Sequence, residues 1–198
     1  MRPHDLLRLA PRAELIAVDD VPGWVNTSLA RAPFVVVRRA EIVGDLVPVG
    51  VRGMRRAERF PALLRRRDIA ETITPETLAR STAPRRDLPA FAALAVVASA
   101  AARFDLVWGP GGSVGFELAS GAPVVTAQSD LDIVLHPHAS NTQVQLEEFV
   151  RCVDAADVRV DATIEAEIGA VAAREWLLSP GSVLIKTRSG PRLGAFAW

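Results

Sequence analysis

Three short apolar runs occupy the first third of the chain, and each is too short to form a buried helix. They are Leu15–Val18, Phe34–Val37 and Leu46–Val51, which are rich in valine and isoleucine and are separated by proline or glycine. A buried strand needs only four to eight such residues, whereas a helix needs a longer pattern. The first third is therefore predicted to consist of β-strands, which must pair into a sheet.

A break in this pattern lies between residues 72 and 89, where three prolines interrupt the chain. We place a domain boundary there, with a smaller β-rich N-terminal domain over residues 1–80 and a second domain over residues 86–198. The segment Leu88–Arg103 is predicted to be a buried helix, because alanine and leucine dominate a stretch too long for one strand.

The second domain alternates strand and helix signals. The segments are predicted, in chain order, as strand 105–108, helix 114–120, strand 131–135, helix 141–153, strand 158–168 and strand 183–186. This order indicates an α/β or α+β domain, so the whole chain is expected to have an α/β (α+β) fold.

The charge balance excludes several classes of function. The chain has 23 basic and 23 acidic residues, so no overall field should attract nucleic acid or an anionic membrane. The longest apolar run, Leu88–Ala102, is shorter than the roughly 20 residues of a membrane span. A single cysteine, Cys152, cannot form an internal disulfide. We therefore expect a cytoplasmic protein without nucleic-acid or membrane partners.

A glycine-rich segment, Gly109–Ser113, lies between a predicted strand and a predicted helix. Glycines let backbone N–H groups converge, and a helix N-terminus presents unpaired donors, which together favour a phosphate group. Ser113 could add a hydroxyl donor or cap the helix. Most turns of this kind bind nothing, and no Gly-Lys-Ser/Thr sequence follows as in a Walker loop.

Two carboxylates follow on the next predicted strand, at Asp130 and Asp132. Residues two apart on a strand project from the same face, so these side chains repel each other unless a cation lies between them. Carboxylate oxygens with open positions suit Mg²⁺, which completes its shell with water and substrate phosphate. The alternative is an exposed strand edge with turn-forming aspartates.

The interval between the two motifs resembles the active site of the nucleotidyltransferase superfamily. Gly112-Ser113, a short helix, a Gly-Ala-Pro turn and an Asp-x-Asp strand follow one another in that order. The resemblance implies a mixed sheet in which the Gly-Ser turn grips a triphosphate and the acids hold Mg²⁺. It also implies a third acid on a later strand, for which Asp161 is the candidate and Glu165 the reserve. These three aspartates are the expected catalytic and metal-binding residues.

A closer resemblance spans nearly the whole chain. The segments that carry it are Arg2–Leu7, Val47–Gly53, Gly115–Ala119, Ser129–Asp132, Glu175-Trp176, Leu184–Thr187 and Gly190–Leu193. Together they resemble the phosphoribosyl-dephospho-CoA transferase family, the holo-acyl-carrier-protein synthases of malonate decarboxylase systems.

This resemblance implies a specific reaction. Members transfer phosphoribosyl-dephospho-CoA from 2′-(5″-triphosphoribosyl)-3′-dephospho-CoA to a serine of the malonate decarboxylase acyl carrier protein, and pyrophosphate leaves. The carrier hydroxyl would attack the α-phosphorus in line with Mg²⁺ assistance, and either Asp161 or Asp130 would act as the base. Two alternatives remain: another nucleotidyltransferase acting on a small hydroxyl compound, and a non-catalytic carrier-binding module.

Basic residues outside these motifs are candidates for binding the substrate. Arg52 and Arg55 follow a Gly-Val turn, with Arg56 and Arg59 close behind, and could bind phosphates in bidentate fashion. Lys186 is the sole lysine and could reach the triphosphate, or could lie at a strand edge as a solvated side chain. His4 is expected to have a structural or substrate-contact role.

Overall fold

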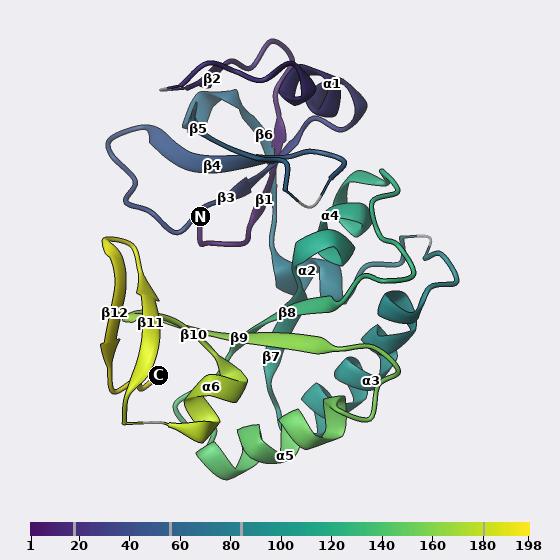
Figure 1. The fold of residues 1–198 in the computed structure, drawn as a ribbon, viewed down its shortest axis with the longest axis vertical. Helices are drawn as coiled ribbons and strands as arrows, with labels where there is room; N and C mark the ends of the chain where they lie inside the picture. The colour runs from purple at the N-terminus through teal and green to yellow at the C-terminus, as the bar shows by residue number, and fades with distance from the viewer. Residues whose placement is uncertain (18, 56, 84, 180) are drawn as a thin grey trace.

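A computed structural model describes residues 1–17, 19–55, 57–83, 85–179 and 181–198. Its N-terminal part is an antiparallel sheet with the strand order β2-β5-β4-β3-β1-β6, drawn at the top of Figure 1. The strands are β1 (Leu6–Leu9), β2 (Leu15–Ile16), β3 (Phe34–Val37), β4 (Leu46–Arg52), β5 (Arg59–Arg65) and β6 (Ile69–Ile73). A 3-10 turn, η1 (Arg66–Asp68), joins the last two.

The two faces of this sheet differ because successive side chains point to opposite sides. One face, with Val47, Val49 and Val51 of β4, is buried under helix α1 (Gly23–Arg31). The other face carries Gly50 and Arg52, which line a cavity together with Gly111, Gly112 and Phe116 of the C-terminal half. This second face, which also carries Leu6 and Val36, is therefore the one that meets the C-terminal half.

The C-terminal sheet has the order β12-β11-β10-β9-β8-β7. Its strands are β7 (Val107–Pro110), β8 (Leu131–His136), β9 (Val160–Ala166), β10 (Gly169–Ala172), β11 (Val183–Thr187) and β12 (Gly190–Gly194). Of the strand pairs in the described residues, β8 and β9 alone run parallel. A parallel pair needs a crossover connection, which helix α5 (Gln143–Val153) supplies.

Helices cover one face of this second sheet (Figure 1). Leu131, Ile133 and Leu135 of β8 are fully buried in a core that includes residues of α3 (Pro89–Arg103), α5 and α6 (Ala173–Leu178). The alternate residues Asp132 and His136 are half-buried on the opposite face. That face looks toward the N-terminal sheet, so the two sheets enclose a cleft between them.

An apolar contact and a short helix join the two sheets. Leu6 and Phe34 belong to the same core as helix α4 (Gly112–Ser120), and the rings of Phe34 and Phe116 pack edge to face at 6.5 Å. Helix α2 (Pro75–Ala79) follows β6 and packs against β7. The cleft therefore has walls fixed by packing.

The predicted α+β class and mixed C-terminal sheet are confirmed, with differences in individual elements. β9 ends at Ala166 and a turn leads to β10, because Gly169, at φ +140°, divides the predicted strand 158–168 from a strand that was not predicted. Gly109 and Pro110, predicted as turn residues, end β7. Only Leu15 and Ile16 of the run 15–18 form a strand, and Val18 lies outside the described residues.

Candidate active site

The glycine-rich turn brings a carboxylate against a helix N-terminus. Gly111 is the N-cap of α4, and its N–H donates to the backbone oxygen of Asp132 at 2.9 Å. Gly112 adopts φ +53°, and a β-carbon there would lie only 2.7 Å from the Asp132 Cγ. Only glycine fits both requirements, so this position lets the Asp132 carboxylate sit beside the first turn of α4. Because Gly111 is the N-cap, Ser113 is not the cap, and it lines the adjacent cavity instead.

Three aspartates influence one another at this point. Asp132 lies opposite Asp161 in the parallel register of β8 and β9, and Asp130 precedes β8 by one residue. Burial raises the pKa of Asp132, and the charges of Asp130 and Asp161 raise this pKa further, whereas His4 and Arg52 act against the increase. Like charges held together in this way are stabilised by a cation.

The arrangement fits magnesium bound through two carboxylates. Within the described ranges, no group of three acidic, histidine or cysteine side chains converges on one point. Asp161 instead accepts a bond from Arg159 Nε at 2.7 Å. Mg²⁺ commonly uses one or two protein carboxylates together with water and substrate phosphates, which matches Asp130 and Asp132.

The reserve acid, Glu165, contacts the N-terminal domain. It is buried, and its carboxylate accepts from the Arg39 guanidinium and lies 3.2 Å from His4 Nε2. Burial alone would raise the pKa of Glu165, but the bonds and charges of His4 and Arg39 lower it below its usual value. This cluster holds the two sheets together at the edge of the cleft.

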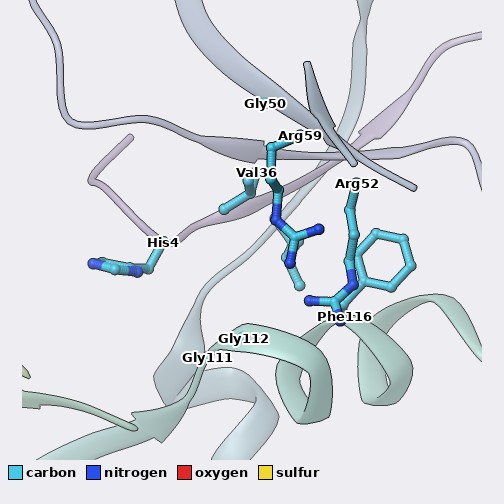
Figure 2. Close-up of a pocket in the computed structure, with 9 residues that line it drawn as sticks. His4, Val36, Gly50, Arg52, Arg59, Gly111, Gly112 and Phe116 are labelled. Atoms are coloured by element: carbon cyan, nitrogen blue, oxygen red, sulfur yellow. The ribbon is translucent and has the colours of Figure 1, made fainter. Parts of the chain in front are cut away.

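Two arginines form the opposite wall of the site. Arg52 and Arg59 are directly paired on β4 and β5, and their side chains extend from the N-terminal sheet toward Gly111 and Gly112 (Figure 2). Both line a cavity of about 350 Å³ together with Ser113, Asp130 and Asp132, and both line a smaller cavity beside it. The site thus combines two cations and two carboxylates across one cleft.

The other predicted basic residues lie elsewhere. The Arg55 side chain is 87% exposed beside Glu58 and lines neither cavity, while Arg56 lies outside the described residues. Lys186 lines neither of these two cavities, but lies in a groove that adjoins the smaller one at His4 and Val36. The residues placed together by the structure are Gly112, Ser113, Arg52, Arg59 and the aspartates.

A buried glutamate supports the loop that leads to the site. Glu117 accepts two bonds from Arg86, at 2.6 and 2.7 Å, and two from the N–H groups of Val124 and Val125. Burial would raise the pKa of Glu117, but these bonds lower it. Val124 lines the larger cavity, so Glu117 fixes one of its walls. In the sequence, the only signal for Glu117 was that it belongs to the segment Gly115–Ala119, which carries the family resemblance.

The fold and site define a two-sheet α+β protein with an acidic and a basic wall around one cleft. The family model described as "Phosphoribosyl-dephospho-CoA transferase MdcG N-terminal domain" matches residues 2–75, and the corresponding C-terminal domain model matches residues 77–195. The chain belongs to this family. The domain limits at residues 80 and 86 stay predictions.

Curated relatives agree with this assignment over the full length. Proteins named phosphoribosyl-dephospho-CoA transferase from Pseudomonas putida (strain GB-1) and Pseudomonas syringae pv. tomato are each 41% identical, covering 100% and 99% of this chain and 95% and 92% of their own. The one from Klebsiella pneumoniae (strain 342) is 34% identical over all of this chain and 96% of its own. No solved structure matches significantly. In the described parts of the chain, no helix is long and apolar enough to cross a membrane.

Proposed function

We propose that this protein transfers the phosphoribosyl-dephospho-CoA group from its triphosphoribosyl donor to a serine of the malonate decarboxylase acyl carrier protein, with release of pyrophosphate. The observation that carries the proposal is the position of Asp130 and Asp132 across one cavity from Arg52 and Arg59. A triphosphate bound with a divalent cation needs both kinds of group on opposite sides. We place the reaction in the cytoplasm.

The carboxylate wall provides the place for magnesium. Asp130 and Asp132 would hold Mg²⁺, with Asp161 beside them in register. When bound, this ion neutralises charge on the phosphates and on the departing pyrophosphate. Gly112 leaves room for the Asp132 carboxylate, and the N-terminus of α4 offers N–H donors and partial positive charge to a phosphate oxygen.

The arginine wall orients the donor. Guanidinium groups bind phosphate oxygens through paired N–H bonds and do not lose their charge near neutral pH. Arg52 and Arg59 approach the cavity from the N-terminal sheet, whereas the carboxylates approach it from the C-terminal sheet. The triphosphate is therefore held between the two halves of the chain, and both are needed for binding.

The chemical step is an in-line displacement at the α-phosphorus. The carrier serine oxygen forms a bond to this phosphorus as the bond from phosphorus to the bridging oxygen of pyrophosphate breaks. The serine proton passes to a carboxylate, for which Asp161 and Asp130 are the two candidates on this face. Arg159 Nε donates to Asp161 Oδ1 at 2.7 Å, which orients that carboxylate on this face.

The test is the intact mass of the carrier subunit after incubation with the protein, Mg²⁺ and the triphosphoribosyl donor. We expect a mass increase equal to the donor minus pyrophosphate, and no increase with the Asp130→Asn variant. An unmodified carrier with a folded wild-type protein would contradict the proposal. Pyrophosphate release from ATP or CTP with a small hydroxyl acceptor would then favour another nucleotidyltransferase activity, and donor binding without turnover would favour a non-catalytic module.

A further inference from the structure

The cleft continues beyond the phosphate cavity. A second cavity shares Arg52, Arg59 and Gly112 with the first, and it also shares His4 and Val36 with a third space, a groove of about 840 Å³. The three spaces adjoin in sequence between the two sheets. One extended ligand can therefore run from the aspartates, past Val36, into the groove.

The chemistry of the walls changes along this path. Between the phosphate cavity and the groove, the intervening cavity has Arg52 and Arg59 at the phosphate end and His4 at the groove end, and Leu6, Val36 and Phe116 form an apolar part of its wall. The groove itself is basic, and its cations are Arg38, Arg39, Lys186 and Arg188. The order is thus phosphate site, apolar section, cationic groove.

Most cations of the groove have no acidic partner. Arg39 is bound to Glu165. Among the described residues, by contrast, no carboxylate is paired with Arg38, Lys186 or Arg188, and all three side chains are exposed. Lys186 lies on the cleft face because it pairs with Ala170, which in turn pairs with Glu165. Arg38 follows Val36 by two residues, which places it on the corresponding face of the N-terminal sheet.

We propose that this groove binds the 5′-diphosphate of the donor's dephospho-CoA portion, through Arg38, Lys186 and Arg188. The inference rests on the proposed function. A triphosphoribosyl-dephospho-CoA molecule carries two anionic groups, the triphosphate and the 5′-diphosphate. An uncharged ribosyl-adenosine section separates them. The cleft presents two cationic regions, Arg52 with Arg59 and the groove, separated by an apolar section. The order of anionic groups along the donor therefore matches the order of cationic regions along the cleft.

The continuity of the cleft favours the donor over the carrier protein as the occupant. An acidic protein surface would also be attracted to these cations, but a stable protein interface buries about 800 Å² on each partner and so extends well beyond one groove. Here the cations lie in a groove between His4 and the β11–β12 hairpin, continuous with the cavity that holds the reacting phosphate. A flexible, narrow ligand fits that shape.

The test measures the binding of dephospho-CoA itself by titration calorimetry, which requires no turnover. We expect Lys186→Ala and Arg188→Ala each to weaken the Kd for dephospho-CoA by about tenfold, the loss of one charge-assisted bond to phosphate. Arg192→Ala is the matched control. Arg192 is exposed on the same hairpin but pairs with Ile185, whose side chain is in the helix-covered core, so it lies on the other face. We expect the Kd of the Arg192→Ala variant for dephospho-CoA to stay within about twofold of the wild-type value.

Two results would overturn the inference. One is an unchanged dephospho-CoA Kd in both variants together with a raised KM for the carrier, which would make the groove the carrier surface. The other is a wild-type protein that transfers the group to the carrier yet binds dephospho-CoA no better than the variants. Failure of the proposed function has a different signature: tight dephospho-CoA binding that depends on Lys186, with no modified carrier.

Discussion

Replacement of Gly112 by alanine tests the geometric basis of the site. The added methyl would meet the Asp132 carboxylate, with its carbon 2.7 Å from Cγ, so this carboxylate must move. Alanine at φ +53° also destabilises the folded chain by about 1–2 kcal/mol, because L-residues disfavour this conformation. Alanine restricts the unfolded chain more than glycine does, which offsets about 0.4–1 kcal/mol of this loss. We expect a net loss of about 1 kcal/mol of stability and near-complete loss of transfer.

Gly121 supplies a matched control at the other end of the same helix. It adopts φ +70° as the C-cap of α4, but an added β-carbon there would have no atom within 4 Å. Gly121→Ala should therefore lose a similar stability, about 2–4 °C in Tm for a chain of this size, while keeping transfer. Carrier modification rates and thermal unfolding of both variants measure these effects. Near wild-type transfer by Gly112→Ala, or equal losses of transfer in both variants, would refute the reasoning.

Three further substitutions separate the roles of charged residues. Asp132→Asn should abolish carrier modification but raise Tm in the presence of EDTA. Burial raises the pKa of Asp132, so the wild-type protein loses stability as pH rises through that pKa. The amide of the variant does not ionise and therefore avoids this loss. A lower Tm for this variant would contradict the charge argument. Arg52→Ala should raise the donor KM at least tenfold with a smaller effect on kcat, and an unchanged KM in steady-state kinetics would make the residue structural. Glu165→Gln should destabilise the chain by about 1–3 kcal/mol above pH 4.5, where the lowered Glu165 pKa adds stability, and the difference should vanish as pH falls through that pKa. Urea unfolding at several pH values measures this difference, and a loss that is independent of pH would show that the charge is not responsible.

The sequence alone brought together the residues proposed for the phosphate end of the site, through the spacing that resembles the nucleotidyltransferase superfamily. Gly112, Ser113, Asp130 and Asp132 lie within 21 consecutive residues, and a turn, a short helix and a strand fix their relative positions. The same resemblance implied a third acid on a later strand, and the structure has its candidate, Asp161, opposite Asp132 in the register of β8 and β9. These are features that short-range sequence rules describe well.

The remaining contacts join residues far apart in the chain. Glu165 meets Arg39 across 126 positions, and Arg86 meets Glu117 across 31, so no local pattern relates them. Strand β5 was not predicted because its sequence, Arg59–Arg65, combines proline with charged ends, and only pairing with β4 defines it. The groove could not be predicted either, since it forms where the β11–β12 hairpin approaches β3.

The shared apolar core between the sheets has a consequence for how the chain can be divided. Leu6 and Phe34 of the N-terminal sheet lie in one core with Phe116 of helix α4, which belongs to the C-terminal half of the chain. A fragment cut near residue 80 would expose these side chains to water and lose, for each, about 1.5–3 kcal/mol of burial free energy. The two halves are thus expected to melt in a single cooperative transition, and the C-terminal half is not expected to fold stably without the N-terminal sheet.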